Sequence, residues 1–183
     1  MKKALLLTFV VILLVGCRSK RIDLKMGIGV YTTITEILAA TPHAHGFGEV
    51  SSVFAAVTIN DDGVIVHCKL DEAATRVVFS YSGAVVNELS AIIMTKAEFG
   101  DSYGLRHTSP INKEWHEQAA AFAQWVVGKT MREVKAIELK TDPENYGLPA
   151  EPELAAVVAI PVTRFINAIE KAYNNARQAQ SER

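Results

Sequence analysis

The stretch VSSVFAAVTINDDGVIVHCKL, residues 50–70, predicts a β-hairpin. We expect strands over Val50–Ile59 and Val64–Leu70, joined by a turn at 60–63, where Gly63 follows Asn60-Asp61-Asp62 and supplies the positive φ of tight hairpins. Side chains alternate between the two faces of a strand. The residues expected to face the core are Val53, Ala55, Val57 and Ile59 in the first strand, and Val64, Val66, Cys68 and Leu70 in the second.

Two further strands are predicted on either side of this hairpin. Residues 26–34 are rich in β-branched side chains, and Arg76–Ser82 carries alternating apolar residues. The proline and glycines of 41–48 mark a loop, and the acidic pair Asp71-Glu72 is typical of a turn. Together these segments predict an antiparallel meander.

The second half of the chain reads as helical. Lys113–Val127 has an apolar stripe formed by Trp115, Ala119, Phe122 and Val126, and Gly128 is a natural helix end. Thr130 and Glu133 have capping-box spacing, so a short helix should run to about Ile137. After a loop over 140–153, a last helix is expected from near Thr163, with a buried side formed by Phe165, Ile166, Ile169, Ala172, Tyr173 and Ala176. Strands followed by helices indicate an α+β fold with helices on one face of the sheet.

The N-terminus begins with Lys2-Lys3 and continues as an apolar run, Ala4–Val15. This run is too short to span a bilayer, which takes ~20 apolar residues. With Leu14-Val15-Gly16-Cys17 at its end, it resembles a bacterial lipoprotein signal. The resemblance implies cleavage before Cys17, palmitate-type acylation of that cysteine, and attachment to membrane lipid on the extracytoplasmic side of the cell envelope. A plain secretory signal and an uncleaved anchor are the alternatives.

These features divide the chain into a signal peptide (1–16), a lipidated tether (17–25), one α+β domain (26–177) and a frayed tail (178–183). Loss of the signal removes two lysines and changes the formal net charge from −1 to −3. With no basic cluster in the domain, we expect no nucleic-acid partner. Once Cys17 carries lipid, Cys68 has no disulfide partner and is expected to be a buried thiol.

Motifs for metal binding and catalysis are weak. His43 and His45 have a spacing that, with another histidine, could hold zinc or copper, but His67 and Cys68 point to opposite faces of their strand, so we predict no metal site. There is no Gly-x-Gly-x-x-Gly or Walker motif, which favours a non-enzymatic role. Gly27-Ile28-Gly29, inside a strand, predicts a bulge or a close backbone approach.

Several segments resemble a known family whose members bind a cofactor. The segments 53–59, 62–66 and 163–172 resemble the hairpin and closing helix of small FMN-binding domains, and 95–104 and 113–118 are similar to segments of uncharacterised exported relatives of that family. The resemblance implies a flavin site. Covalent attachment is not expected, because Ala159 stands where flavin-carrying members have a threonine. Non-covalent FMN would use Tyr103, Gly104, Trp115 and Thr163, with its phosphate at a helix N-terminus. Taken as single residues, Tyr103 and Trp115 are better explained as core aromatics.

Two functions therefore stand side by side. In the first, the chain is a lipid-anchored flavin-binding or electron-transfer module. In the second, it is a surface lipoprotein without a cofactor that contacts an envelope protein through the same fold.

Overall fold

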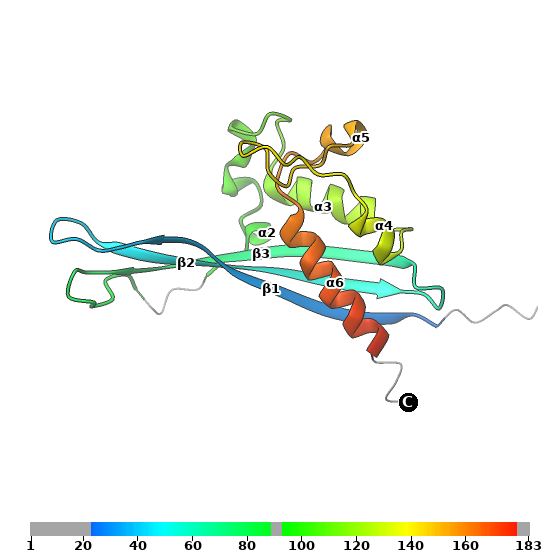
Figure 1. The fold of residues 1–183 in the computed structure, drawn as a ribbon, viewed down its shortest axis with the longest axis horizontal. Helices are drawn as coiled ribbons and strands as arrows, with labels where there is room; N and C mark the ends of the chain where they lie inside the picture. Colours follow the sequence, from blue (N-terminus) through cyan, green and yellow to red (C-terminus); the bar gives the residue numbers. More distant parts are fainter. Residues whose placement is uncertain (1–22, 89–92, 179–183) are drawn as a thin grey trace, which may run out of the picture.

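The computed structural model describes residues 23–88 and 93–178 (Figure 1). Three long strands form one antiparallel sheet in the order β1-β2-β3: β1 (Lys25–Leu38), β2 (Gly46–Ile59) and β3 (Ile65–Phe79). The predicted meander is confirmed. The predicted signal peptide and Cys17 lie outside the described residues, as does the tail after Gln178.

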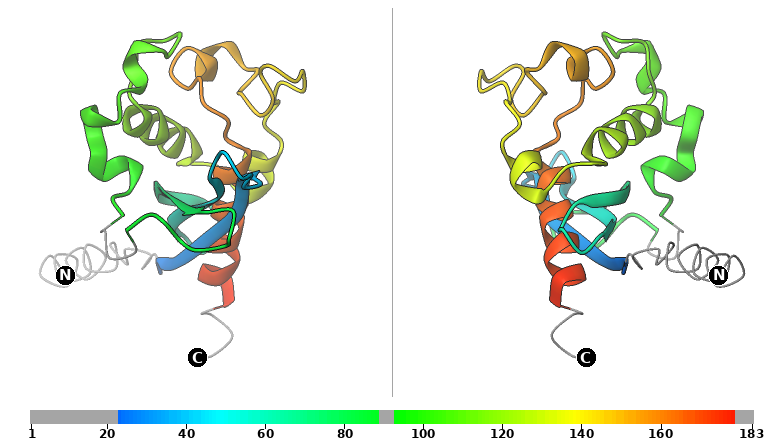
Figure 2. Two further views of the ribbon diagram at one scale, coloured as in Figure 1. Left: turned by 90° about the vertical axis from the view of Figure 1, so that its left-hand side faces the viewer. Right: turned by 90° about the vertical axis from the view of Figure 1, so that its right-hand side faces the viewer.

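In the described part of the chain, the long helices lie on one face of the sheet. The two long ones, α3 (Trp115–Val126) and α6 (Thr163–Gln178), contact β3 and the β1–β2 pair respectively. Figure 2 looks along the strands and shows both helices on the same side. The remaining helices are short: α2 (Lys96–Phe99), η1 (Gly100–Tyr103), η2 (Leu105–His107), α4 (Met131–Lys135) and α5 (Pro152–Ala155). The general α+β class is confirmed. Within the described ranges, no helix has the length and apolar character needed to span a bilayer.

The hydrophobic core lies between the sheet and the two long helices. The predicted stripe of α3 is buried, and so is every residue predicted for the inner side of α6. The Phe165 ring lies 5.9 Å from Phe122 and 5.8 Å from Trp115, the latter edge to face. Gly128 has φ of 87°, and Thr130 and Glu133 form the predicted capping box. The positions and buried sides of α3 and α6, and the start of α4, are therefore confirmed.

Helix α6 approaches β1 unusually closely. A Cβ atom on Gly27 would lie 2.1 Å from the carbonyl oxygen of Ala172, and one on Gly29 would lie 2.2 Å from that of Ala168. Glycine on the strand and alanine on the helix together allow this distance. The predicted close backbone approach at Gly27-Ile28-Gly29 is confirmed.

Two predictions about β3 are wrong. The segments Val64–Leu70 and Arg76–Ser82 are not separate strands, because β3 runs unbroken through Asp71-Glu72. The facing of the first residues is also shifted: a bulge opposite Thr58 and Ile59 buries Ile65 and leaves Val66 exposed. One extra residue in a strand reverses the side to which its neighbours point.

Candidate functional site

The most distinctive surface is the sheet face opposite the helices. Strand alternation places Val53, Ala55 and Val57 against the helices, so their neighbours point to the other side. In the described part of the chain no helix lies on that side (Figure 1). We call it the open face, and define it by the exposed or half-exposed apolar residues Met26, Ile28, Val30, Ile34, Val50 and Phe54.

The apolar side chains of this face are unusually exposed to solvent. Met26 is 66% exposed, Ile28 61%, Ile34 67% and Phe54 38%. Register pairs Val30 with Phe54 and Phe54 with Asp71, and pairs Ile28 with Ala56 and Ala56 with Lys69. A shallow hollow of about 170 Å³ lies over these two rows, lined by Ile28, Phe54, Ala55, Ala56, Lys69, Leu70 and Asp71.

The covered face holds a buried ion cluster around Glu72, which is only 2% exposed. Its Oε1 accepts a hydrogen bond from the Ser51 hydroxyl at 2.6 Å. The same oxygen lies 3.0 Å from Lys96 Nζ and 3.0 Å from Arg164 Nη2. Arg164 Nη1 also donates to Ser51 Oγ at 2.6 Å. The cluster joins β2, β3, α2 and α6, and its one carboxylate is shared by two cations.

Three of the four residues predicted to bind a cofactor are brought together near this cluster. Lys96 Nζ lies 5.5 Å from the ring centroid of Tyr103 and 5.5 Å from that of Trp115, within cation–π range. Gly104 follows Tyr103 with φ of 81° and remains exposed. Trp115, however, is 4% exposed and packed in the core. The fourth residue, Thr163, precedes Arg164 of the cluster and has its hydroxyl against Gly147.

A small groove of about 270 Å³ lies between β3 and α3. Trp115 and His116 line one wall, and His67, Cys68 and Leu70 line the other. The Nδ1 atom of His116 is buried without a hydrogen-bond partner. Burial raises the pKa of the Cys68 thiol to about 12, so this sulfur stays protonated at neutral pH and is a poor nucleophile. The groove can accept a ligand but offers no reactive thiolate.

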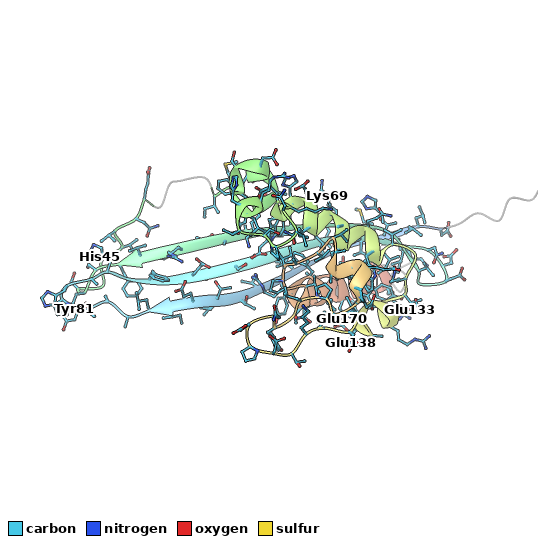
Figure 3. The ribbon with its side chains drawn as sticks, turned by 90° about the horizontal axis from the view of Figure 1, so that it is seen from above. His45, Lys69, Tyr81, Glu133, Glu138 and Glu170 are labelled. Atoms are coloured by element: carbon cyan, nitrogen blue, oxygen red, sulfur yellow. The ribbon has the colours of Figure 1, made fainter. Side chains whose placement is uncertain are left out.

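His43 and His45 lie at the end of the sheet that projects beyond the helices. Figure 3 shows His45 and Tyr81 at this tip. They line a hollow of about 460 Å³ together with Thr41, Pro42, Ala44, Ser80 and Ser82. Across the described ranges, no group of three or more histidine, cysteine, aspartate or glutamate residues is placed to hold a metal ion.

Sequence reasoning missed the ion cluster because it assigned Asp71-Glu72 to a turn. The sequence did contain a signal for it. Cys68, Leu70 and Glu72 are alternate residues, so in a continuous strand they share one face and the carboxylate points to the core. It also missed Gln118, whose amide nitrogen donates to Lys113 O and whose amide oxygen accepts from the Ala159 N–H at 2.8 Å. Ala159, the position compared with a flavin-linked threonine, is thus held by its backbone.

Comparison with protein-family models, with curated proteins and with solved structures finds no match for this chain.

Proposed function

We propose that this chain is a lipid-anchored extracytoplasmic protein that binds another protein through the open face. The observation that carries the proposal is the uncovered apolar sheet surface itself. A sheet of 14-residue strands with the usual rise and spacing presents roughly 600 Å² in plan. Thr32, Ser52, Lys69 and Asp71 interrupt the apolar part of this face, so the apolar area is smaller and comparable with the ~300–600 Å² of the largest apolar patch of a monomer. Covering such a surface is favourable by about 25 cal/mol per Å² of apolar area removed from water.

The contact would use the face and not the β1 edge. At that edge, Asn175 Oδ1 accepts the Ile28 N–H at 3.1 Å, and Lys171 Nζ donates to the Val30 carbonyl at 2.9 Å. A partner strand added there would have to displace these side chains of α6. The apolar side chains of the open face have no such obstacle.

The anchor rests on the Leu14–Cys17 motif, where acyl chains on Cys17 would hold the protein to membrane lipid. More than one chain is needed for stable attachment. The described chain begins just before β1, at the end of the sheet opposite the His45 tip (Figure 1, Figure 3). Anchoring at this end would therefore direct the tip away from the lipid.

Photo-crosslinking in intact cells tests the contact. A benzoylphenylalanine placed at Ile28 of the full chain is expected to give protein adducts on irradiation, because this side chain belongs to the open face and is 61% exposed. The control is the same residue at Glu138, which is also exposed but lies on the helix-covered side (Figure 3). Equal yields from the two positions, or none from position 28, would contradict the proposal.

A second candidate is non-covalent flavin binding by an FMN-binding-like fold, favoured by the groove beside Trp115 and by the unpaired Nδ1 of His116. An aromatic wall and one polar group are what a planar ring would use. The groove is slightly smaller than the ~300–1,000 Å³ typical of ligand sites, so it would hold part of the isoalloxazine. Tyr103, Gly104 and Thr163 are the proposed neighbours of the rest.

Titration with FMN tests this second function. In a Trp125→Phe background, which leaves Trp115 as the one tryptophan of the sequence, binding should quench indole fluorescence saturably. The yellow colour should stay with the protein on gel filtration and be released from it on denaturation. His116→Leu should raise the dissociation constant of FMN about tenfold, because it removes the polar group that would bind the ring. A colourless protein whose fluorescence ignores FMN would exclude flavin at this groove.

A further inference from the structure

The residues of the open face indicate what kind of protein would bind there. This inference rests on the proposed protein contact. Strand β2 is apolar on both sides: Val53, Ala55 and Val57 face the core, and Phe54 and Ala56 face outward. Strands whose two faces are both buried have such continuous apolar runs. The sequence of β2 is therefore that of a strand in the middle of a sandwich, with one layer supplied from outside.

Charges on the face point to a second copy of this chain. In the two central rows, the charged residues are Lys69 and Asp71, at alternate positions of β3. Lys69 is exposed and has no ion pair among the described residues. Asp71 uses Oδ1 to accept the N–H groups of Glu72 and Ala97, which leaves Oδ2 available. A two-fold axis between them would set each lysine opposite the aspartate of the other copy.

The same axis matches the shapes of the apolar side chains. Leu70, Ala55 and Gly29 lie at one level of the sheet. A two-fold axis at that level, parallel to the sheet and perpendicular to its strands, places Phe54 of each copy over Ala56 of the other. Large over small is how packed layers interdigitate, and the hollow of about 170 Å³ over Ala56 lies where the ring would enter. Ile28 then faces Val30 of the second copy.

We infer that the open face binds a second copy of this chain, sheet against sheet, about a two-fold axis at the level of Leu70. About this axis nine levels of each strand overlap, from Lys25 to Thr33 in β1, so the contact covers roughly 400 Å² in plan. This is about half of the ~800 Å² that each partner buries in a stable complex, which is the size of a reversible contact. Phe54 is the central anchor, and the Lys69–Asp71 pairs set the register. Aligned sheets pack about 10 Å apart with their strands within ~30° of one another.

This axis makes a prediction about pairs of positions. Met26 of one copy would face Thr32 of the other, because these residues lie equally far on either side of Gly29. Two Met26 residues would be separated by roughly 20 Å, given the rise of about 3.3 Å per residue. A mixture of Met26→Cys and Thr32→Cys chains should therefore be joined by a short bis-maleimide, whereas either variant alone should not. The parent chain with Cys17 and Cys68 gives the background, and Cys68 is protected by its high pKa.

The experiment uses the full chain in mild detergent, with the two variants carrying tags of different mass. Phe54→Lys in both chains should lower the linked product at least about 30-fold, as loss of a central hot spot does. Tyr146→Lys, an exposed aromatic on the helix side, should leave it unchanged. Thermal unfolding must show that Phe54→Lys still folds; if it does not, Ile28→Lys takes its place.

The outcomes separate the two proposals. Linkage in the mixture alone, lost with Phe54→Lys, supports the two-fold dimer. No linkage, or equal linkage in the single variants, overturns it. If position 28 gives photo-adducts of another mass only, the second copy is excluded while the protein contact stands. If position 28 gives no adduct at all, both proposals fall.

Discussion

Replacing Gly29 by alanine is expected to lower the free energy of unfolding by about 3 kcal/mol or more. The new methyl group would lie 2.2 Å from Ala168 O and 2.4 Å from Ala172 N. Both are backbone atoms of α6, so no side chain can turn away to make room, and the helix would have to leave the sheet. Overpacking of a core costs ~1–3 kcal/mol even where neighbours can adjust.

The control for this prediction lies on the neighbouring strand. A Cβ atom on Gly48 would meet no atom within 4 Å, so Gly48→Ala should change the free energy of unfolding by less than about 1 kcal/mol. Urea denaturation of both variants measures the difference. Similar midpoints for Gly29→Ala and Gly48→Ala would show that α6 is not held at the distance described.

This contact illustrates what can be predicted from sequence. Gly27-Ile28-Gly29 indicated a close approach because glycine in a strand interior needs a reason. Ala172 and Ala176 lay on the predicted inner side of α6, whereas Ala168 was not among the residues predicted there. Both features are local patterns. Which element meets these glycines depends on tertiary packing. The periodicity of a local sequence does not identify α6 as that element.

The errors in β3 have the same origin. Asp71 and Glu72 are rare in strand interiors, and propensity favoured a turn. The strand continues because Lys96 and Arg164, distant in sequence, neutralise Glu72, and because Ser51 donates to it. The bulge near Ile65 depends on pairing of the strand start with Lys129, whose carbonyl accepts the Ile65 N–H at 2.9 Å. Long-range partners overrode local preference in both cases.

The open face was also visible in the sequence, though as an anomaly. Half-buried strands alternate apolar and polar residues, whereas residues 53–57 of β2 are apolar on both faces of the strand. From sequence alone this excess does not say which face the helices cover. Once α6 covers the face with Gly27 and Gly29, the bulkier Ile28 and Val30 must point outward. The glycines that admit the helix therefore also determine which apolar surface is left for a partner.

The ion cluster gives the other large prediction. Glu72→Ala is expected to lower the free energy of unfolding by about 2–4 kcal/mol, because it leaves Lys96 and Arg164 without their counter-charge and Ser51 without its acceptor. Breaking a buried pair typically costs ~3–5 kcal/mol. The lower range reflects the side chain of Arg164, which is one-third exposed and can turn toward water.

Glu49→Ala is the matched control, since this carboxylate lies on the next strand and pairs with Arg76 at 2.9 Å in a more exposed setting. Exposed pairs contribute ~0–1 kcal/mol, so the loss should be small. The hydrogen bond from the Thr35 hydroxyl, followed by that from Arg76, lowers the pKa of Glu49. Its contribution is therefore present above the unfolded-state pKa and disappears as pH falls through the lower folded value, and both variants are compared at pH 7.

A double variant separates charge from packing at the cluster. If the cost of Glu72→Ala comes from uncompensated positive charge, adding Arg164→Met should recover part of the lost stability, because replacing a buried ion group as a whole is often neutral. If the cost comes from lost packing, the two changes should add. Chemical denaturation of the single and double variants decides between these results, and a Glu72→Ala chain as stable as Glu49→Ala would mean that the cluster does not hold α2 and α6 to the sheet.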